Sequence, residues 1–470
     1  MKKIISIVLA LMIVLSLCAC APGGEGGGTD SKSTFQVGYG REKMMPETSV
    51  PLGGYGRAES RMSTGFLDYL YATCIAITDS EGNTVLLMST DATRSLYEFR
   101  GDVSAATGIP EDHIYMNGTH THSAPAVGLE NPSILAYEAI VKKAHVNAAQ
   151  KALEDRQPAE IYYGTSKSEG LNFVRHYLME DGTYAGDNFG NHNQPYVKNA
   201  TEVDPTIHIV KFDRGEEHKP IVLMNWRAHP TITGGSDKYD ISADYVGSLR
   251  EYMEKTLSCN FIYVQGAAGN VNPRSRIKED TPTDDYKLYG QQLGGFALQA
   301  MENMEKLETG TIQTQKMTFS ASVDHSRDHL LKEAQEIEAM WNSGASFSQC
   351  ASYGQPYGIR SPYMAESIIK NYNQGETMDL ELNVIALGDQ LAFCTASNEI
   401  FDSTGAYVEE KSCFDKTIFL SCTNGHKGYI PSAIAFEYTC YETDNTRYVP
   451  GTAETLADHH LAMLKALKGE

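Results

Sequence analysis

An apolar run leads directly into two histidines in the stretch His113-Ile114-Tyr115-Met116-Asn117-Gly118-Thr119-His120-Thr121-His122-Ser123-Ala124-Pro125. A long amphipathic helix is expected after this stretch, so the histidines lie where a strand passes into a loop. Such a junction can place His120 on a metal ion and leave His122 facing a substrate. Taken alone, the pattern also fits two surface histidines in a polar loop. The choice depends on whether other segments supply partners for the imidazoles.

Short apolar runs alternate with helical periodicity along most of the 470 residues. The expected strands are 85–88, 114–116, 207–210, 221–226, 261–264, 384–387, 391–395 and 418–422. The expected helices are 134–153, 245–257, 286–304 and 453–467. This alternation predicts an α/β fold with a mixed, largely parallel β-sheet core flanked by helices. Residues 325–375 are more polar and helical, and we interpret them as an insertion.

The first 34 residues carry signals for export and anchoring. A basic start at residues 1–3 precedes an apolar run, residues 4–17, that is too short to span a membrane. Leu17-Cys18-Ala19-Cys20 matches a lipobox, so residues 1–20 are expected to be a lipoprotein signal peptide with Cys20 lipidated. The glycine-rich residues 21–34 predict a flexible tether. The expected location is the outer face of a bacterial membrane, attached through the lipid alone; ordinary secretion is the alternative.

The composition restricts the class of protein. The sequence is 41% hydrophobic and 21% charged, and residues 35–470 are expected to form one globular domain. The net charge of −21 argues against nucleic acid and against anionic lipid surfaces as partners. The cysteines beyond Cys20 form no CxxC pair, so they are expected to be buried thiols. They are Cys74, Cys259, Cys350, Cys394, Cys413, Cys422 and Cys440.

Several chemically interesting side chains each follow an expected strand. In chain order they are His120, His229, Asn272, Glu399 and Tyr429. Because ligands collect outside the carboxyl ends of strands in α/β sheets, the five loops are expected to converge on one site. Two imidazoles, one carboxylate and one phenol form the nitrogen and oxygen set that a borderline Lewis acid such as Zn²⁺ accepts. A catalytic zinc ion also keeps a place for water, whose pKa it lowers toward neutrality.

Short motifs occur in order from about residue 37 to the C-terminal helix. They are Pro51-Leu52-Gly53-Gly54-Tyr55-Gly56, Gly118-Thr119-His120-Thr121-His122-Ser123-Ala124-Pro125, Asn225-Trp226 with His229-Pro230-Thr231, Asn398-Glu399, and Asn424-Gly425 with Gly428-Tyr429. Together they resemble the motifs of the neutral/alkaline (non-lysosomal) ceramidases in their N-terminal catalytic domain. In that family Asn398-Glu399 corresponds to Pro-Gly-Glu, so only the carboxylate is kept.

The resemblance implies a zinc-dependent amidohydrolase of an N-acyl compound, with a role in sphingolipid metabolism. The implied zinc ligands are His120, His229, Glu399 and Tyr429. His122 would then shuttle a proton, and Arg175 would hold the carbonyl oxygen near the scissile amide. From the residues alone, Glu399 also fits a structural carboxylate, Tyr429 a core tyrosine, and Arg175 a surface salt bridge.

The sequence departs from the family at Asn272. The family has a serine tied to activity in Gly-Asp-Val-Ser-Pro-Asn, whereas the aligned segment here is Gly269-Asn270-Val271-Asn272-Pro273-Arg274. An amide side chain cannot act as the nucleophile that a hydroxyl could be, but it can donate a hydrogen bond to a carbonyl oxygen. A covalent acyl-serine at this position is therefore excluded, and Asn272 is expected to help stabilise the oxyanion.

The leading hypothesis is a lipid-anchored, extracytoplasmic zinc amidohydrolase that acts on a small-molecule or lipid substrate. A rival from another class is a zinc-containing surface lipoprotein that binds a lipid or glycan without catalysis. A third hypothesis keeps the same zinc site but assumes that a different bond is cleaved, which gives a zinc hydrolase of a polar N-acyl or ester substrate. The sequence does not indicate an oligomeric state.

Overall fold

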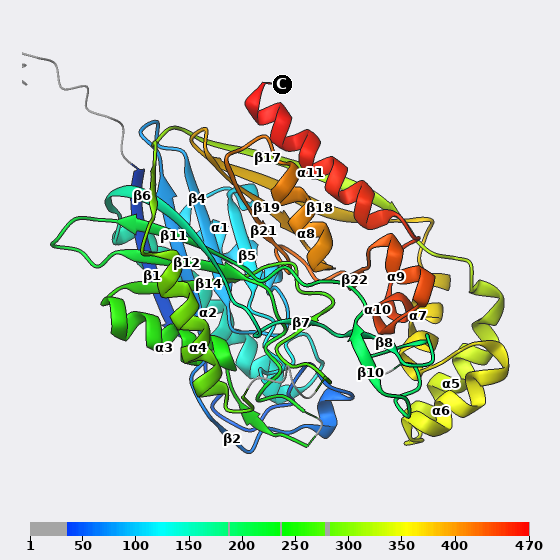
Figure 1. Ribbon diagram of the computed structural model, residues 1–470. Helices are drawn as coiled ribbons and strands as arrows, with labels where there is room; N and C mark the ends of the chain where they lie inside the picture. The colour runs from blue at the N-terminus through cyan, green and yellow to red at the C-terminus, as the bar shows by residue number, and fades with distance from the viewer. Residues whose placement is uncertain (1–34, 187–188, 236, 278–282, 470) are drawn as a thin grey trace, which may run out of the picture. The chain divides into compact units, whose positions relative to one another are not determined.

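Two β-sheets stack face to face, and helices cover both outer faces (Figure 1). The computed structural model describes residues 35–186, 189–235, 237–277 and 283–469. The predicted signal peptide, Cys20 and the tether, residues 1–34, lie outside the described residues. Contacts group Ser33–Glu470 into one compact unit.

The larger sheet has the strand order β14-β12-β11-β6-β1-β3-β4-β5, with β16 paired to β6. Its strands are β1 Phe35–Lys43, β3 Tyr71–Thr78, β4 Thr84–Thr90, β5 Ile114–Gly118, β6 Gln157–Lys167, β11 Thr206–Asp213, β12 Ile221–Trp226, β14 Asn260–Gln265 and β16 Glu305–Leu307. The α/β class and the mixed sheet are as predicted, but "largely parallel" is wrong. Among the described strands of this sheet, β4 with β5 and β12 with β14 are the parallel pairs, and the others are antiparallel.

The error arises from strands that the apolar runs did not reveal, above all β1. Gly38 and Gly40 interrupt its pattern, and glycine is disfavoured inside strands. A Cβ atom on Gly38 would lie 2.0 Å from the carbonyl oxygen of Ala152, and one on Gly40 would lie 2.0 Å from that of Ala148. Both carbonyls belong to helix α2 (Pro132–Glu154). The two glycines therefore allow α2 to pack directly on the backbone of β1.

The smaller sheet has the order β17-β18-β19-β21, with β17 Ile312–Ser322, β18 Thr377–Leu387, β19 Leu391–Ala396 and β21 Lys416–Leu420. Its inner face and the inner face of the larger sheet share one apolar core. Side chains of this core include Leu87, Val210 and Ile262 from the larger sheet, and Ile385, Phe393 and Ile418 from the smaller. Each expected strand is present, although β21 ends two residues earlier than expected.

Helices complete the outer layers. Helices α1 (Arg100–Thr107) and α2 cover one half of the larger sheet, and α3 (Tyr245–Leu257) and α4 (Tyr286–Ala300) cover the other. Helices α8 (Asp402–Lys411) and α11 (Thr452–Lys468) cover the smaller sheet (Figure 1). Each expected helix is present, with α4 ending at Ala300. Within the described residues, no helix combines the length and the hydrophobicity that crossing a membrane requires.

Short elements line the loops around the sheets. They are β2 Gly65–Phe66, β7 Phe173–Val174, β8 His176–Met179, β9 Tyr184–Gly186, β10 Tyr196–Asn199, β13 Asp240–Ile241, β15 Val271–Asn272, β20 Glu399–Ile400, β22 Tyr429–Ile430, α9 Ala433–Tyr438, α10 Tyr441–Asn445, and 3-10 turns at Ala58–Ser60, Tyr97–Phe99, Glu111–His113, Asp328–Leu330 and Gln355–Tyr357. Six of the seven cysteines are buried thiols, as expected, and Cys413 is partly exposed.

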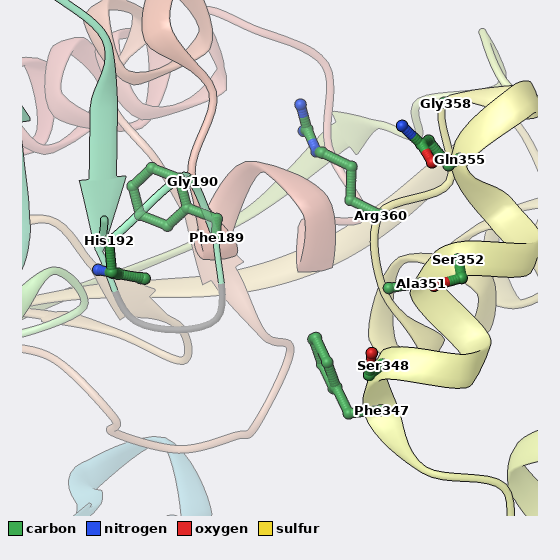
Figure 2. Close-up of a pocket in the computed structure, with 10 residues that line it drawn as sticks. All are labelled: Phe189, Gly190, His192, Phe347, Ser348, Ala351, Ser352, Gln355, Gly358 and Arg360. Carbon is green, nitrogen blue, oxygen red and sulfur yellow. The ribbon is translucent and has the colours of Figure 1, made fainter. Parts of the chain in front are cut away.

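The insertion, residues 325–375, folds into three helices between β17 and β18. They are α5 (Leu331–Asn342), α6 (Phe347–Gly354) and α7 (Pro362–Tyr372), and they share a small apolar core of their own. The hydroxyl of Ser346 caps α6, whose first residues Phe347 and Ser348 appear in Figure 2. Serine at the position before a helix satisfies backbone N–H groups that have no partner in the first turn.

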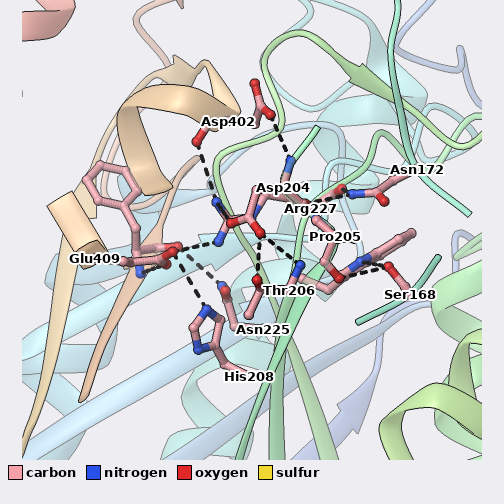
Figure 3. Close-up of polar contacts among 12 residues, drawn as sticks. Ser168, Asn172, Asp204, Pro205, Thr206, His208, Asn225, Arg227, Asp402 and Glu409 are labelled. Atoms are coloured by element: carbon pink, nitrogen blue, oxygen red, sulfur yellow. Dashed lines mark hydrogen bonds and ion pairs between the residues drawn. The ribbon is translucent and has the colours of Figure 1, made fainter. Parts of the chain in front are cut away.

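A buried arginine joins the loops behind the site-bearing strands (Figure 3). Arg227 follows β12, and its guanidinium lies 2.8 Å from Asp204 Oδ2 and 2.8 Å from Glu409 Oε2. Burial alone would raise the pKa of Glu409, but the charge of Arg227 outweighs it and lowers the pKa to about 2. Nearby, Asp402 accepts a hydrogen bond from Asn270 Nδ2 at 2.7 Å. These contacts fix the loops after β12 and β14 against α8.

Replacing Arg227 by methionine is expected to lower the free energy of unfolding by about 3–5 kcal/mol, because Asp204 and Glu409 lose their buried cation. The measurement is urea denaturation followed by circular dichroism. A second change, Glu409→Leu in the Arg227→Met background, should recover part of the loss. The control is Lys411→Ala, which removes an exposed ion pair with Glu410 and should leave stability nearly unchanged. Equal losses in Arg227→Met and Lys411→Ala would contradict this account.

Candidate metal centre

Side chains from both sheets meet at one edge of the sandwich. His120 and His122 follow β5, and His229 follows β12, so all three histidines come from the larger sheet. Glu399 begins β20 after β19, and Tyr429 begins β22 after β21. Strands β20 and β22 form a short parallel ladder in which Glu399 is paired with Tyr429. The structure therefore brings the four predicted zinc ligands to the strand ends, where they were expected.

His120 is held in an unusual backbone conformation. Its φ angle is +70°, in the left-handed region that non-glycine residues rarely adopt. Its backbone N–H donates to the carbonyl of Ala92 at 2.9 Å, and the N–H of Thr119 donates to Thr90 at 2.9 Å. Strained conformations of this kind persist where the surroundings enforce them, and they cluster at functional sites.

The carboxylate of Glu399 lies between two imidazoles. Its Oε2 atom is 3.2 Å from His120 Nε2 and 3.3 Å from His229 Nε2. The Nδ1–H of His229 donates to the carbonyl of Val271 at 2.9 Å, which leaves Nε2 of that ring facing Glu399. A backbone partner on one ring nitrogen is the usual way in which a metal-binding histidine is oriented.

Glu399 and the histidines shift one another's pKa values. Burial disfavours the charged form of His120, but the Glu399 carboxylate outweighs burial and holds the pKa of His120 well above its usual value. In the same way, His120 holds the pKa of Glu399 well below its usual value against the effect of burial. Burial and the charge of Arg175 lower the pKa of His229 to about 4.

The residues present fit a divalent metal ion. Both ring nitrogens of His122 are buried without a hydrogen-bond partner, and His120 Nε2 faces the Glu399 carboxylate at 3.2 Å. Ligand atoms of His120, His122 and His229 lie within 4.8 Å of one another. A buried polar atom without a partner costs about 1–3 kcal/mol, and a cation between these nitrogens and the Glu399 carboxylate would remove that cost. Imidazole nitrogen and carboxylate oxygen are ligands that suit zinc.

His122 differs from the other two imidazoles because it lines a pocket. The pocket has a volume of about 260 Å³ and is lined by Gly54, Tyr55, Gly56, His122, Arg175, Thr231, Asn272, Tyr363, Tyr429 and Tyr441. The ring of Tyr55 packs edge-on against His122 at 5.1 Å. A Cβ atom on Gly54, whose φ is +95°, would lie 2.6 Å from His122 Cγ. Glycine at this position therefore allows the loop to close against His122.

The electrostatics of His122 favour its neutral form. Burial lowers its pKa well below the usual value, and the charges of His120 and His229 lower it further. A neutral imidazole in a pocket wall can accept a proton.

Arg175 is 6% exposed and lines the same pocket, which excludes the alternative of a surface salt bridge. Its Nε atom is 2.6 Å from Glu442 Oε1. Its Nη2 atom donates to the carbonyl of Gly269 at 3.0 Å and to the hydroxyl of Tyr429 at 3.3 Å. Its Nη1 atom lies 3.5 Å from the side-chain oxygen of Asn272. The structure thus brings Arg175 and Asn272 together at the pocket wall.

A further buried group lies behind Arg175. His176, Cys440 and Glu442 are close enough to hold a metal ion, but the ring nitrogens of His176 already have partners. Nε2 is 2.7 Å from Glu442 Oε2, and Nδ1 is 2.9 Å from the hydroxyl of Tyr438. This group therefore supports Arg175 through Glu442.

Several pocket residues were not anticipated from the sequence. Tyr363 lies in the insertion, and Tyr441 lies in a segment without a recognisable motif, so no pattern indicated either. Tyr55 belongs to a quoted motif, but nothing assigned it a place beside His122. Glu442 could have been anticipated only on physical grounds, because a buried arginine requires a carboxylate partner.

Comparisons with known proteins agree with this fold. The family model for neutral/alkaline non-lysosomal ceramidase, N-terminal, matches residues 35–272. The crystal structure of neutral ceramidase from Pseudomonas aeruginosa is similar, with a TM-score of 0.70 and 16% sequence identity over 93% of this chain and 75% of that chain. A structure described as a ceramidase complexed with C2 has a TM-score of 0.68 and 15% identity over 93% and 76% of the two chains. No curated protein matches the sequence.

Single substitutions should separate the roles of the three histidines. His120→Ala and His229→Ala are each expected to lose a tightly bound divalent metal ion, because both rings face the Glu399 carboxylate. His122→Ala should retain the ion. The measurement is elemental analysis of metal per protein after dialysis against a weak chelator.

The matched control is His329→Ala, which removes an exposed histidine in a turn of the insertion. It should leave the metal content unchanged. Loss of the ion in His122→Ala to the same extent as in His120→Ala would show instead that His122 is a third imidazole ligand.

Proposed function

This chain belongs to the neutral/alkaline non-lysosomal ceramidase family, and we propose that it is a zinc-dependent amidohydrolase that cleaves the amide bond of an N-acyl compound. Family membership makes it a ceramidase-like hydrolase. The observation that carries the finer proposal is the meeting of His120, His229 and Glu399 beside a pocket lined by His122 and Arg175. A metal centre and a proton acceptor side by side are what metal-dependent amide hydrolysis uses.

The proposed zinc ligands are His120, His229, Glu399 and Tyr429. When bound, zinc supplies Lewis acidity that activates water near neutral pH. The ligand set combines two nitrogen and two oxygen donors, a set that zinc accepts. Tyr429 is half-buried beside Glu399, and desolvation together with the charge of Glu399 holds the pKa of its hydroxyl well above the usual value, against the charge of Arg175.

The chain's own residues would handle the proton and the developing charge. His122, kept neutral by burial, is placed to accept a proton from the attacking water and to return it to the leaving amine. The guanidinium of Arg175, fixed by Glu442 and Gly269, would donate hydrogen bonds to the carbonyl oxygen as it gains negative charge. Asn272 would add a polar contact on the same side, and it offers no hydroxyl for acyl transfer.

Metal removal tests the proposal. Chelator-treated, metal-free protein is expected to lose hydrolysis of every substrate in a set of N-acyl amines, and stoichiometric zinc should restore it. The measurement is release of free amine. His122→Ala, loaded with zinc, should show kcat lower by roughly 10²–10⁴-fold. Metal-free protein that hydrolyses these substrates at the native rate would overturn the proposal.

A second candidate function is supported by Asn272, which stands where the family has a serine tied to activity. In this alternative the protein is a zinc-containing surface lipoprotein that binds a lipid or glycan and does not catalyse. Stoichiometric zinc without release of product from any N-acyl or ester substrate would favour it. Release of alcohol from esters without cleavage of amides would instead indicate a zinc esterase with the same site.

We also propose that the protein is attached to the outer face of a bacterial membrane by lipid on Cys20, as the Leu17-Cys18-Ala19-Cys20 sequence indicates. Cys20→Ser should move the protein from the membrane fraction to the soluble fraction, as measured by fractionation and by incorporation of a labelled fatty acid. The control is Cys259→Ser, which alters a buried thiol far along the chain and should leave the protein attached. A Cys20→Ser protein that remains fully in the membrane fraction would contradict lipidation.

A further inference from the structure

The pocket beside the metal centre is small, and its walls are polar. Its volume of about 260 Å³ lies just below the roughly 300–1,000 Å³ of pockets that enclose drug-sized ligands. Four tyrosines, Arg175, His122 and Asn272 form most of its lining. Within the described residues, no Val, Leu, Ile, Met or Phe side chain lines it. Such a pocket can enclose an amide and a few carbon atoms, but it cannot enclose two long hydrocarbon chains.

Tyr363 closes one side of this pocket. It is the second residue of α7, whose start is fixed because the hydroxyl of Ser361 accepts from the N–H of Met364 at 3.0 Å and Pro362 occupies the first turn. The Tyr363 ring meets the ring of Tyr441 edge-on, with centroids 5.9 Å apart and planes at 89°. Tyr363 is therefore a rigid part of the pocket wall and not a mobile surface side chain.

Aromatic contacts continue on both sides of Tyr363. Tyr441 packs against Tyr429 at 5.8 Å, and so connects the row to the metal centre. On the other side, Tyr363 packs against Trp341 of α5 at 6.2 Å and against Phe347 of α6 at 6.1 Å. Edge-to-face pairs at these distances favour defined ring positions. One row of rings thus runs from the insertion to the metal centre.

A larger pocket is lined by Phe347, the ring at the insertion end of this row (Figure 2). Its volume is about 530 Å³. One wall is formed by the insertion, with Phe347 and Ala351 of α6, and Phe189 stands on the opposite wall. Arg360 also lines it, and its Nε atom is held by Asp444 of α10 at 3.0 Å. Phe347 lines this larger pocket and packs on Tyr363, which lines the pocket beside the metal centre, so one pair of rings in contact joins the linings of the two pockets.

We propose that Tyr363 is a specificity-determining residue that separates the two pockets and restricts the substrate to compact, polar N-acyl compounds with acyl groups of a few carbons. This inference rests on the proposed amide hydrolysis at the metal centre. With the ring in place, each added methylene of a longer acyl chain either collides with the tyrosine wall or stays in water. Without the ring, the chain can enter the larger pocket and contact Phe347 and Phe189.

The experiment compares N-acetyl-, N-butanoyl- and N-octanoylethanolamine below their critical micelle concentrations. For the native zinc-loaded protein, kcat/KM is expected to fall at least about tenfold from acetyl to octanoyl. In Tyr363→Ala, the ratio of octanoyl to acetyl should rise at least about tenfold, because each methylene that becomes buried is worth roughly fourfold. An unchanged circular dichroism spectrum and an unchanged zinc content show that the variant is folded.

Two control variants test whether the aromatic ring of Tyr363 is responsible. Tyr363→Phe should keep the native selectivity, since the ring and not the hydroxyl separates the two pockets. Tyr372→Ala removes an exposed tyrosine at the other end of α7 and should also keep it. An independent readout is equilibrium binding of N-octanoylethanolamine to metal-free protein, which should be tighter for Tyr363→Ala than for the native chain.

The outcomes are distinguishable. A native preference for octanoyl, or an unchanged ratio and unchanged binding in Tyr363→Ala, would overturn the inference and leave amide hydrolysis standing. Failure of the zinc-loaded native protein to cleave any of the three amides would reject the proposed function instead. In that case tighter binding of N-octanoylethanolamine by the metal-free Tyr363→Ala protein would still support the separation of the two pockets by Tyr363.

Discussion

The spacing of the two sheets at the site edge is set by a buried amide, and the metal centre depends on that spacing. The Nδ2 group of Asn117 donates to the carbonyl of Ser421 at 2.7 Å, next to the smaller sheet, and its Oδ1 atom accepts from the N–H of Gln265 at 2.8 Å in the larger sheet. His120 comes from the larger sheet, whereas Glu399 comes from the smaller. A change in sheet spacing would therefore move these two side chains apart.

Other buried amides act in the same way. Asn225 donates from Nδ2 to the carbonyl of Val264 at 3.1 Å and to that of Phe419 at 3.3 Å, so it also connects the two sheets. Asn424 accepts from the N–H of Met116 at 2.8 Å. Backbone groups at the ends of strands have no ladder partner, and leaving them unpaired in the core is costly. The asparagines satisfy these groups and fix the geometry at the same time.

The strand ends could be predicted from the sequence because the strands concerned are buried on both faces. Continuous apolar runs such as Ile221–Trp226 mark such strands, and the polar residue that follows marks the edge where a ligand collects. The apolar runs therefore predicted that His229 and Glu399 lie at that edge. They did not predict whether neighbouring strands are parallel or antiparallel, because this depends on pairing partners such as β1, in which glycines conceal the apolar pattern.

The pocket walls could not be predicted for a different physical reason. Tyr363 reaches the site only because the insertion folds back from the smaller sheet and places α7 against α10. No periodicity encodes that placement, since it depends on tertiary contacts such as the pairing of Arg360 with Asp444. Equally, a surface salt bridge remained an alternative for Arg175, because its buried partner, Glu442, is far away in the sequence.

The proposed metal ligands and much of the pocket wall therefore come from different parts of this fold, and Tyr429 belongs to both. The proposed ligands lie on strand ends that two packed sheets hold in register, so changes there would disturb the core. Part of the pocket wall comes from the loop at Gly54-Tyr55-Gly56, from the insertion and from α10, which lie outside the two sheets. Family membership thus carries strong implications for the metal centre and weak ones for the substrate. Asn272 fits this division, because its side chain lies 3.5 Å from Arg175 at the pocket wall and is not among the proposed ligands.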